Sequence, residues 1–227
     1  KWWLQNCIAS KTKVTLNGKW IHIGTNMLAF ENPCLTEVNR KEGFDIIKNK
    51  SFNEPFDYCF VGGLNENKGV KDLVSIFSTL NKKDIGTLHI IGDGPLRNDI
   101  ELIASKSNIP IIFHGFLSKE EIINIYKKCH FIVLPSKSEG FPKVIGEAIN
   151  YGCVPIVSNV SCISQYIQNN SNGFLIEPLT EENLKQVIQQ SLLLSKMDFK
   201  NYIAYNYKTA EKFTFSFSTF STLYVLL

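Results

Sequence analysis

The sequence lacks the marks of a membrane-spanning or disulfide-linked protein. No apolar run approaches the roughly 18 residues that a spanning helix requires, and the first residues show no signal peptide. Six cysteines are present, but they form no Cys-x-x-Cys pair and do not follow the spacing of metal ligands. Cys59 and Cys153 stand in apolar runs, where a thiol usually serves as a small hydrophobic side chain. These absences favour the reducing cytosol and predict no structural metal.

The chain also lacks a strong charge of either sign, internal repeats and low-complexity segments. Its formal net charge is +3 and its lysines are scattered, which is not the footprint of a nucleic-acid-binding protein. The mild positive charge is compatible with anionic ligands or with peripheral contact at a membrane surface. With 227 residues, of which 44% are hydrophobic, the chain can bury one core and part of a second.

What the sequence does contain is a regular alternation of short apolar runs and amphipathic stretches. The apolar runs predict strands at residues 58–61, 88–91, 109–113, 131–134, 154–157 and 174–176. The amphipathic stretches predict helices at residues 69–80, 96–105, 119–128, 142–150 and 162–168. Strands that alternate with helices indicate βαβ units. We therefore predict an α/β fold, a Rossmann-like parallel sheet with helices on both faces.

The ends of the chain and the segment before the first predicted strand differ from this pattern. Residues 1–25 offer only short strand-like runs. Residues 35–57 are polar and mixed, so we expect a connection there with one helical turn at best. Beyond Thr180, which has the character of an N-terminal cap, helices are predicted to about residue 195 and again from about 199 to 212.

Glycine-rich turns follow several of the predicted strands. Gly62 and Gly63 follow the first strand, Gly92-Asp-Gly94 the second, and Gly115 the third. Ligands of open parallel sheets bind in the crevice at the carboxyl ends of the strands, in the loops that come next. The sequence therefore predicts a ligand site along this edge of the sheet.

The stretch from 135 to 152, PSKSEGFPKVIGEAINYG, follows the fourth strand and carries two acids. Pro142 is expected at the first helical position, where its missing N–H costs nothing, and Gly152 ends the helix. Glu139 precedes this helix, and Glu147 lies roughly 7 to 8 Å beyond its start. The free amides at the start of the helix can bind an anion or a hydroxyl. This arrangement suits a long ligand with a polar head, a charged middle and a second polyol, such as a nucleotide-sugar.

The pattern Glu139-Gly-Phe-Pro and then Glu147-Ala, with seven residues between the acids, resembles the donor-binding signature of retaining glycosyltransferases of family 4, which have the GT-B fold. The resemblance covers roughly residues 27–178. Further pieces stand in the expected order: Phe60-Val-Gly-Gly-Leu with Lys68-Gly69, Ile90-Ile-Gly-Asp-Gly-Pro95, and Phe113-His-Gly-Phe116. Four ordered motifs at strand ends are more specific than one pair of acids.

The resemblance implies two catalytic residues, Glu139 and Lys68. Glu139 would contact hydroxyls of the donor sugar, Lys68 would stabilise the leaving diphosphate, and Glu147 would bind the ribose. The other substrate-binding residues that it implies are Gly62, Gly63, His114, Gly115, Phe116, Gly140, Phe141, Pro142 and Val144. Phe141 is expected either to offer main-chain contacts or to pack. No metal and no cofactor are implied beyond the nucleoside-diphosphate-sugar co-substrate, since one carboxylate on a glycine turn, Asp93, is insufficient.

This sequence departs from the family pattern at Gly63, where an Arg normally stands. Loss of a bidentate phosphate partner removes charge stabilisation from the transition state. Three possibilities remain open. Another cation such as Lys71, Lys137 or Lys143 substitutes, the enzyme is slow, or the chain is a relative that only binds.

The resemblance also implies a domain plan and a reaction. Residues 31–212 would be the donor-binding domain, 1–30 the remnant of an N-terminal acceptor domain and linker, and 213–227 a tail that returns toward that domain. We expect a metal-independent hexosyltransferase that acts with retention, on a glycan or lipid-linked acceptor held by the missing N-terminal half. The implied setting is bacterial polysaccharide or glycolipid synthesis, in the cytoplasm or at the inner membrane face.

Two alternatives stay open and one is excluded. The chain could be a non-catalytic nucleotide-sugar-binding module, as Gly63 suggests, or an epimerase that shares the GT-B fold. A dinucleotide oxidoreductase is excluded, because Gly92-Asp-Gly94 is followed by Pro95 and lacks the third glycine of that fingerprint.

Overall fold

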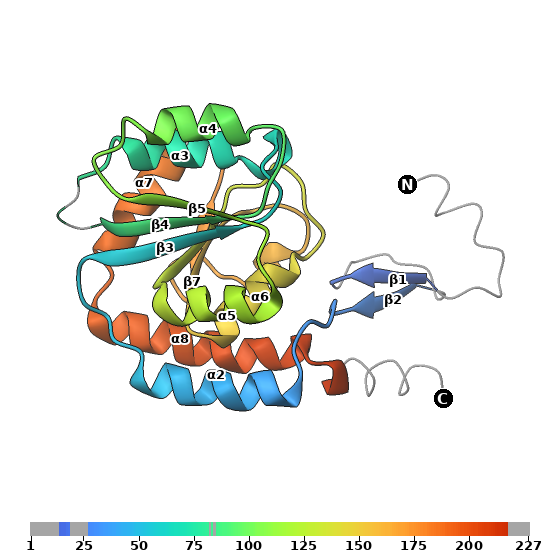
Figure 1. The fold of residues 1–227 in the computed structure, drawn as a ribbon. Helices are drawn as coiled ribbons and strands as arrows, with labels where there is room; N and C mark the ends of the chain where they lie inside the picture. Colours follow the sequence, from blue (N-terminus) through green and yellow to red (C-terminus); the bar gives the residue numbers. More distant parts are fainter. Residues whose placement is uncertain (1–13, 19–26, 82, 84, 218–227) are drawn as a thin grey trace.

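A six-stranded parallel sheet forms the centre of the molecule (Figure 1). The computed structural model describes residues 14–18, 27–81, 83 and 85–217. The sheet has the order β5-β4-β3-β6-β7-β8, and each pairing is parallel. The predicted α/β fold and the six predicted strands are confirmed, with some ends shifted by a few residues. The strands are β3 (Phe56–Val61), β4 (Ile85–Ile91), β5 (Ile111–Gly115), β6 (Phe131–Leu134), β7 (Val154–Ser158) and β8 (Phe174–Ile176).

Helices cover both faces of this sheet, as predicted (Figure 1). One layer contains α3 (Val70–Ser78), α4 (Arg97–Ala104) and α7 (Glu181–Leu192). The other contains α2 (Glu37–Asn49), α5 (Lys119–Lys128), α6 (Lys143–Asn150) and α8 (Lys196–Ala210). Strands β6 and β7 are buried along their whole length between these layers, which explains their unbroken apolar sequences. Cys59 and Cys153 are fully buried, so their predicted role as small hydrophobic side chains is confirmed.

The prediction for residues 35–57 is wrong, because α2 is a helix of 13 residues. Thr36 caps it, accepting a hydrogen bond from the Asn39 amide, while the Asn39 side chain accepts one from the Thr36 amide. Gly43 lets the helix approach α6 closely, since a Cβ there would lie 2.4 Å from the Asn150 carbonyl oxygen. Arg40 donates to Asn150 Oδ1 at 2.6 Å. The N-terminal cap and the packing against α6 therefore stabilise this helix. Neither produces the apolar periodicity by which a helix is predicted from sequence.

Two smaller predictions also need correction. Pro142 is the N-cap of α6 rather than its first helical residue, with φ −72° and ψ 124°. Extended backbone at this position leaves the helix to begin at Lys143. The predicted helix at 162–168 is only a short 3-10 turn, η2 (Ile163–Gln165). The prediction that Gly152 ends α6 is confirmed, because this glycine adopts the left-handed conformation just beyond the helix.

The segments at the two ends of the predicted donor-binding domain lie side by side. The amides of Cys34 and Leu35 donate to the Phe213 carbonyl at 2.9 and 3.0 Å, and the Phe215 amide donates to the Leu35 carbonyl at 3.1 Å. Before them, β1 (Val14–Asn17) and β2 (Met27–Phe30) form a separate parallel pair. Residues 218–227 of the predicted tail lie outside the described residues, and the assignment of 1–30 to another domain stays a prediction. Within the described ranges, no helix is long and apolar enough to cross a membrane.

His130, to which the sequence assigns no role, is buried at the start of β6. Its ring packs against Phe52 and Phe56, and its Nδ1 accepts a hydrogen bond from the Asp57 amide at 3.1 Å. Burial, with the nearby Lys50 ammonium, lowers the pKa of His130 to about 4. The folded protein therefore favours the neutral imidazole.

This burial predicts an acid-dependent loss of stability. The folded pKa of His130 is depressed, so unfolding takes up a proton below the ordinary histidine pKa of about 6.5, and stability falls from that pH down to about 4. Urea unfolding at pH 7 and pH 5 should show a decrease that is larger in the wild type than in His130→Asn by about 1 to 2 kcal/mol. An equal decrease in both proteins would contradict the assignment.

Candidate functional site

Lys68 is positioned by a tight turn after β3. The turn η1 (Glu66–Lys68) is capped by Asn65, whose side chain accepts from the amides of Asn67 and Lys68. Gly69 then adopts a left-handed conformation, with φ +64°. A Cβ at Gly69 would lie 2.3 Å from the Pro135 carbonyl oxygen, so only glycine allows this approach. The Lys68-Gly69 motif therefore holds the lysine against the loop that follows β6.

Two hydrogen bonds fix the same loop to η1. The Lys137 amide donates to the Asn67 carbonyl at 2.7 Å, and Asn67 Nδ2 donates to the Ser138 carbonyl at 3.0 Å. The loop that leads to α6 is thus attached to η1, the turn that follows β3, across about 70 residues of sequence.

The two residues that the resemblance implies as catalytic contact each other. Lys68 Nζ donates a hydrogen bond to Glu139 Oε1. The side chains are 24% and 11% exposed, so water screens this ion pair only in part. An anion that approaches Lys68 would compete with Glu139 for the ammonium group, while the carboxylate would remain beside it to accept hydroxyl hydrogen bonds.

The amino end of α6 opens at this loop. The N-cap, Pro142, offers no side-chain hydrogen bond, and the first turn contains no acidic residue. The Ile145 amide donates to the Pro142 carbonyl at 3.0 Å, so the Lys143 and Val144 amides, with the positive end of the helix dipole, are the groups that an anion can approach. Phe141 is a packing residue, with its ring buried and stacked on Phe213 at 4.4 Å between centroids. Gly140 is exposed, and Val144 is half-buried against the core.

Glu147 lies on α6 beyond the mouth of the site. It is half-buried, and its carboxylate lies 3.7 Å from Lys119 Nζ. Burial raises the pKa of Glu147, and the Lys119 ammonium opposes this increase. Lys119 also donates to the Cys34 carbonyl at 2.7 Å. A carboxylate so held can accept hydrogen bonds from a diol.

The predicted glycine turns come together at the carboxyl edge of the sheet. The Gly62 amide donates to the Ile91 carbonyl at 3.0 Å, and the Gly92 amide donates to the Gly115 carbonyl at 2.8 Å. Gly92 has φ +127°, and a Cβ there would lie 2.0 Å from the Gly62 carbonyl oxygen. Gly63 is partly exposed, and a Cβ there would meet only the Asn65 side-chain amide, at 3.0 Å.

The side chains around Gly115 diverge. Phe116 is 83% exposed. His114 is hydrogen-bonded to His89, with 2.9 Å between His114 Nε2 and His89 Nδ1. Burial lowers the pKa of both imidazoles. The His114 side chain is thus engaged within the sheet, which leaves its backbone as the part that a ligand would contact.

The sequence analysis missed three polar residues that bear on this site. Lys119 stands at an ordinary helix start and gives no signal of its contact with Glu147. Arg97 lies beside the Gly115 turn, where it pairs with Glu101 at 2.7 Å and with Asp93 at 3.6 Å. Asn32 donates from Nδ2 to the Phe141 carbonyl at 2.8 Å. Each contact joins segments that are distant in sequence or belongs to a helix start, so periodicity could not reveal it.

The candidate substitutes for the missing arginine occupy different places. Lys71 is exposed on α3, and Lys143 is exposed at the start of α6, near Glu147. Lys137 lies on the loop beside η1, with Nζ 4.0 Å from the Glu66 carboxylate. Lys137 and Lys143 border the mouth of α6, so these two are the better placed.

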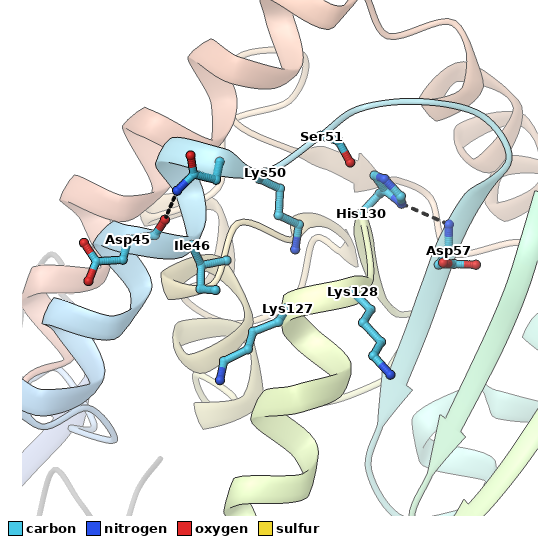
Figure 2. A pocket seen from close by; sticks show the side chains of 9 residues that line it. Asp45, Ile46, Lys50, Ser51, Asp57, Lys127, Lys128 and His130 are labelled. Atoms are coloured by element: carbon cyan, nitrogen blue, oxygen red, sulfur yellow. Dashed lines mark hydrogen bonds between the residues drawn. The ribbon is translucent and has the colours of Figure 1, made fainter.

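A hollow of about 470 Å³ lies at the opposite edge of the sheet (Figure 2). Lys50 reaches into it, and its ammonium group already donates to the carbonyls of Tyr126 and Tyr151 at 2.7 and 3.0 Å. Asp45 and Asp57 line the same hollow. The hollow is lined by charges of both signs, and the Lys50 ammonium is already hydrogen-bonded to the protein. Both facts favour a structural role for Lys50 over ligand binding. No group of three potential metal ligands is present among the residues that the structure describes.

The Lys68–Glu139 ion pair should be measurable as a coupling energy. Lys68→Met leaves a largely buried carboxylate without its partner, which should decrease the free energy of unfolding by about 1 to 3 kcal/mol. In a double-mutant cycle with Glu139→Gln, a coupling of about 1 kcal/mol or more is expected. The exposed pair of Lys137 and Glu66 is the matched control and should couple by less than about 0.5 kcal/mol. Equal coupling in the two pairs would show that the contact at Glu139 is incidental.

Comparison with known proteins identifies the family of this chain. The family model of "Glycosyl transferases group 1" matches residues 42–209. An uncharacterized glycosyltransferase of Methanocaldococcus jannaschii is 27% identical over 151 residues, 66% of this chain and 38% of the relative. The UDP-Gal:alpha-D-GlcNAc-diphosphoundecaprenol alpha-1,3-galactosyltransferase of Escherichia coli is 37% identical over 91 residues, 39% of this chain and 23% of that protein. This chain thus spans less than half the length of these relatives.

Solved structures share the fold. The lipopolysaccharide outer core galactosyltransferase WaaB superposes with a TM-score of 0.72 and 22% identity, over 90% of this chain and 57% of that one. The catalytic domain of the cholesterol-alpha-glucosyltransferase from Helicobacter pylori gives a TM-score of 0.62 and 26% identity, over 70% of this chain and 99% of that one. Because the family model matches most of the chain, from residue 42 to residue 209, this protein belongs to the group 1 glycosyl transferases.

Proposed function

We propose that this chain binds a nucleoside-diphosphate-sugar at the carboxyl edge of its sheet, as the donor half of a retaining, metal-independent hexosyltransferase. One observation carries the proposal: Lys68 and Glu139 meet at the mouth of α6, whose N-cap residue, Pro142, makes no side-chain capping hydrogen bond. A cation, a helix amino end and a hydroxyl acceptor are thereby combined in one place.

In this proposal the diphosphate lies against the amino end of α6. Lys68 leaves Glu139 to neutralise the phosphate oxygens, and the helix dipole adds to this stabilisation. Glu139 then accepts hydrogen bonds from the donor sugar, and Glu147 accepts those of the ribose. Backbone groups at Gly62, His114 and Gly115 border the space for the base.

The transfer step breaks the bond between the anomeric carbon and the diphosphate oxygen. The acceptor hydroxyl oxygen forms the new bond on the same face, and the departing phosphate oxygen takes its proton. Negative charge grows on the diphosphate as the bond breaks, so Lys68 and the amides of α6 stabilise the transition state more than the ground state. This assigns Lys68 to the leaving group and Glu139 to the positive charge that develops on the sugar ring.

The acceptor lies outside the chain's own site in this proposal. Relatives are more than twice as long as the matched region, and we assign the acceptor, a glycan or a lipid-linked sugar, to an N-terminal domain of which β1 and β2 are the remnant. A capsular polysaccharide glycosyltransferase of Staphylococcus aureus and the Escherichia coli galactosyltransferase are among the relatives. Bacterial polysaccharide or glycolipid synthesis, in the cytoplasm or at the inner membrane face, is the setting that we propose.

The glycine at position 63 favours a second candidate, a module that binds the nucleotide-sugar without transferring it. Gly63 places no cation at the turn after β3, where a guanidinium would otherwise reach the diphosphate. A transferase then relies on Lys68 with Lys137 or Lys143 for the same charge.

Calorimetry with UDP, GDP and ADP and with their sugars tests the binding proposal. The chain should bind at least one of these diphosphates, and Lys68→Ala should weaken that binding about tenfold or more, because a charge-assisted contact is lost. Lys200→Ala removes an exposed lysine of α8 and is the control, with affinity within about twofold of the wild type. If the chain bound none of these nucleotides or nucleotide-sugars, the proposal would be refuted.

Gly63→Arg separates the two candidates in the full-length protein. The neighbouring Asn65 amide can move to admit the side chain, so the variant should fold. If lysines already supply the phosphate charge, as a transferase requires, the rate of sugar transfer should change by less than about tenfold. A gain of about a hundredfold or more would identify the native site as a binding module instead.

A further inference from the structure

Asn32 combines an unusual backbone conformation with a long-range hydrogen bond. It stands before Pro33 with φ +46°, in the left-handed region that non-glycine residues seldom occupy. Asparagine tolerates this conformation better than most residues, but the conformation still has an energetic cost. The side chain that this conformation presents donates from Nδ2 to the Phe141 carbonyl at 2.8 Å, across 109 residues of sequence.

The Phe141 carbonyl belongs to the peptide that leads into Pro142, the N-cap of α6. Since Pro142 offers no side-chain cap, the hydrogen bond from Asn32 fixes this peptide from outside the helix. The orientation of that peptide sets how the chain enters α6, and hence where the first-turn amides point.

Phe141 is held on its other side as well. Its ring stacks on Phe213 with an interplanar angle of 11°, and both rings contact Tyr166. The Tyr166 hydroxyl donates to the Glu31 carboxylate. The carbonyl and the ring of Phe141 are therefore both held by the paired segments at the two ends of the donor-binding domain.

The same segment reaches the second acid. The Cys34 carbonyl accepts a hydrogen bond from Lys119 Nζ at 2.7 Å, and Lys119 pairs with Glu147. Residues 31–34 thus contact the turn that follows Glu139. They also contact Lys119, the partner of the Glu147 carboxylate.

We propose that Asn32 is a positioning residue for the donor site: its amide holds the turn at Phe141 and Pro142 so that the amino end of α6 faces the diphosphate. The identity of the ligand rests on the proposed function. The effect of Asn32 on the turn can be tested without it. A displacement of residues 31–34 would move this turn and Lys119 together.

Two variants separate the effect of the Asn32 side-chain hydrogen bond from the effect of its left-handed backbone conformation. Asn32→Asp keeps the size and the tolerance for left-handed φ but presents an acceptor to the Phe141 carbonyl. Asn32→Gly relieves the backbone cost and removes the amide, so it should not lower the melting temperature by much. Asn170, with φ +56° and an exposed side chain in a distant loop, supplies the controls Asn170→Asp and Asn170→Gly.

Hydrogen exchange of the folded chain is the first readout. In both Asn32 variants the hydrogen-bonded amides at the start of α6, beginning with Ile145, which donates to the Pro142 carbonyl at 3.0 Å, should exchange roughly five- to tenfold faster than in the wild type, the factor for a lost hydrogen bond. The Asn170 controls should leave these amides unchanged. Unchanged exchange in the Asn32 variants would overturn the inference, whether or not the chain binds a nucleotide.

Calorimetry with UDP, GDP and ADP and with the matching monophosphates is the second readout. The Asn32 variants should bind the preferred diphosphate roughly five- to tenfold more weakly and the monophosphate within about twofold of the wild type. Equal weakening for both nucleotides would indicate a general loss of structure and would overturn the inference. If the wild type binds none of the nucleotides, the proposed function fails, and the exchange result alone decides the role of Asn32.

Discussion

The left-handed turn at Gly69 is the constraint on which the candidate site depends. It brings the end of η1 so close to the Pro135 carbonyl that a Cβ could not fit between them. Two hydrogen bonds from Asn67 and Lys137 then fix the loop in this place. Without that approach, Lys68 and Glu139, which stand in loops 71 residues apart in sequence, would not contact each other. With it, a cation and a carboxylate meet at the amino end of α6.

Much of this arrangement follows from the sequence, because it depends on local patterns. The apolar runs at β6 and β7 are unbroken since both faces of these strands are buried, and glycines mark the turns where backbones approach closely. Parallel strands place all these turns at one edge. The sequence could therefore predict the sheet and the edge that carries the candidate site.

The parts that the sequence could not predict depend on contacts between distant segments. Helix α2 is polar and is stabilised by its cap and by the docking of Arg40 and Gly43 against Asn150. Lys119 and Asn32 have no local signature, because their partners are residues of other elements. Phe141 looked equally suited to binding and to packing, and only the ring of Phe213 decides for packing. Tertiary context also shortens the predicted helix at 162–168 to a single turn.

A crystal structure of the protein with its preferred nucleoside-diphosphate-sugar tests the central claim most directly. The account predicts a diphosphate within hydrogen-bond distance of the first-turn amides of α6 and of Lys68, with the sugar beside Glu139 and the ribose beside Glu147. A nucleotide bound at another place, with the contact between Lys68 and Glu139 unchanged, would contradict the account.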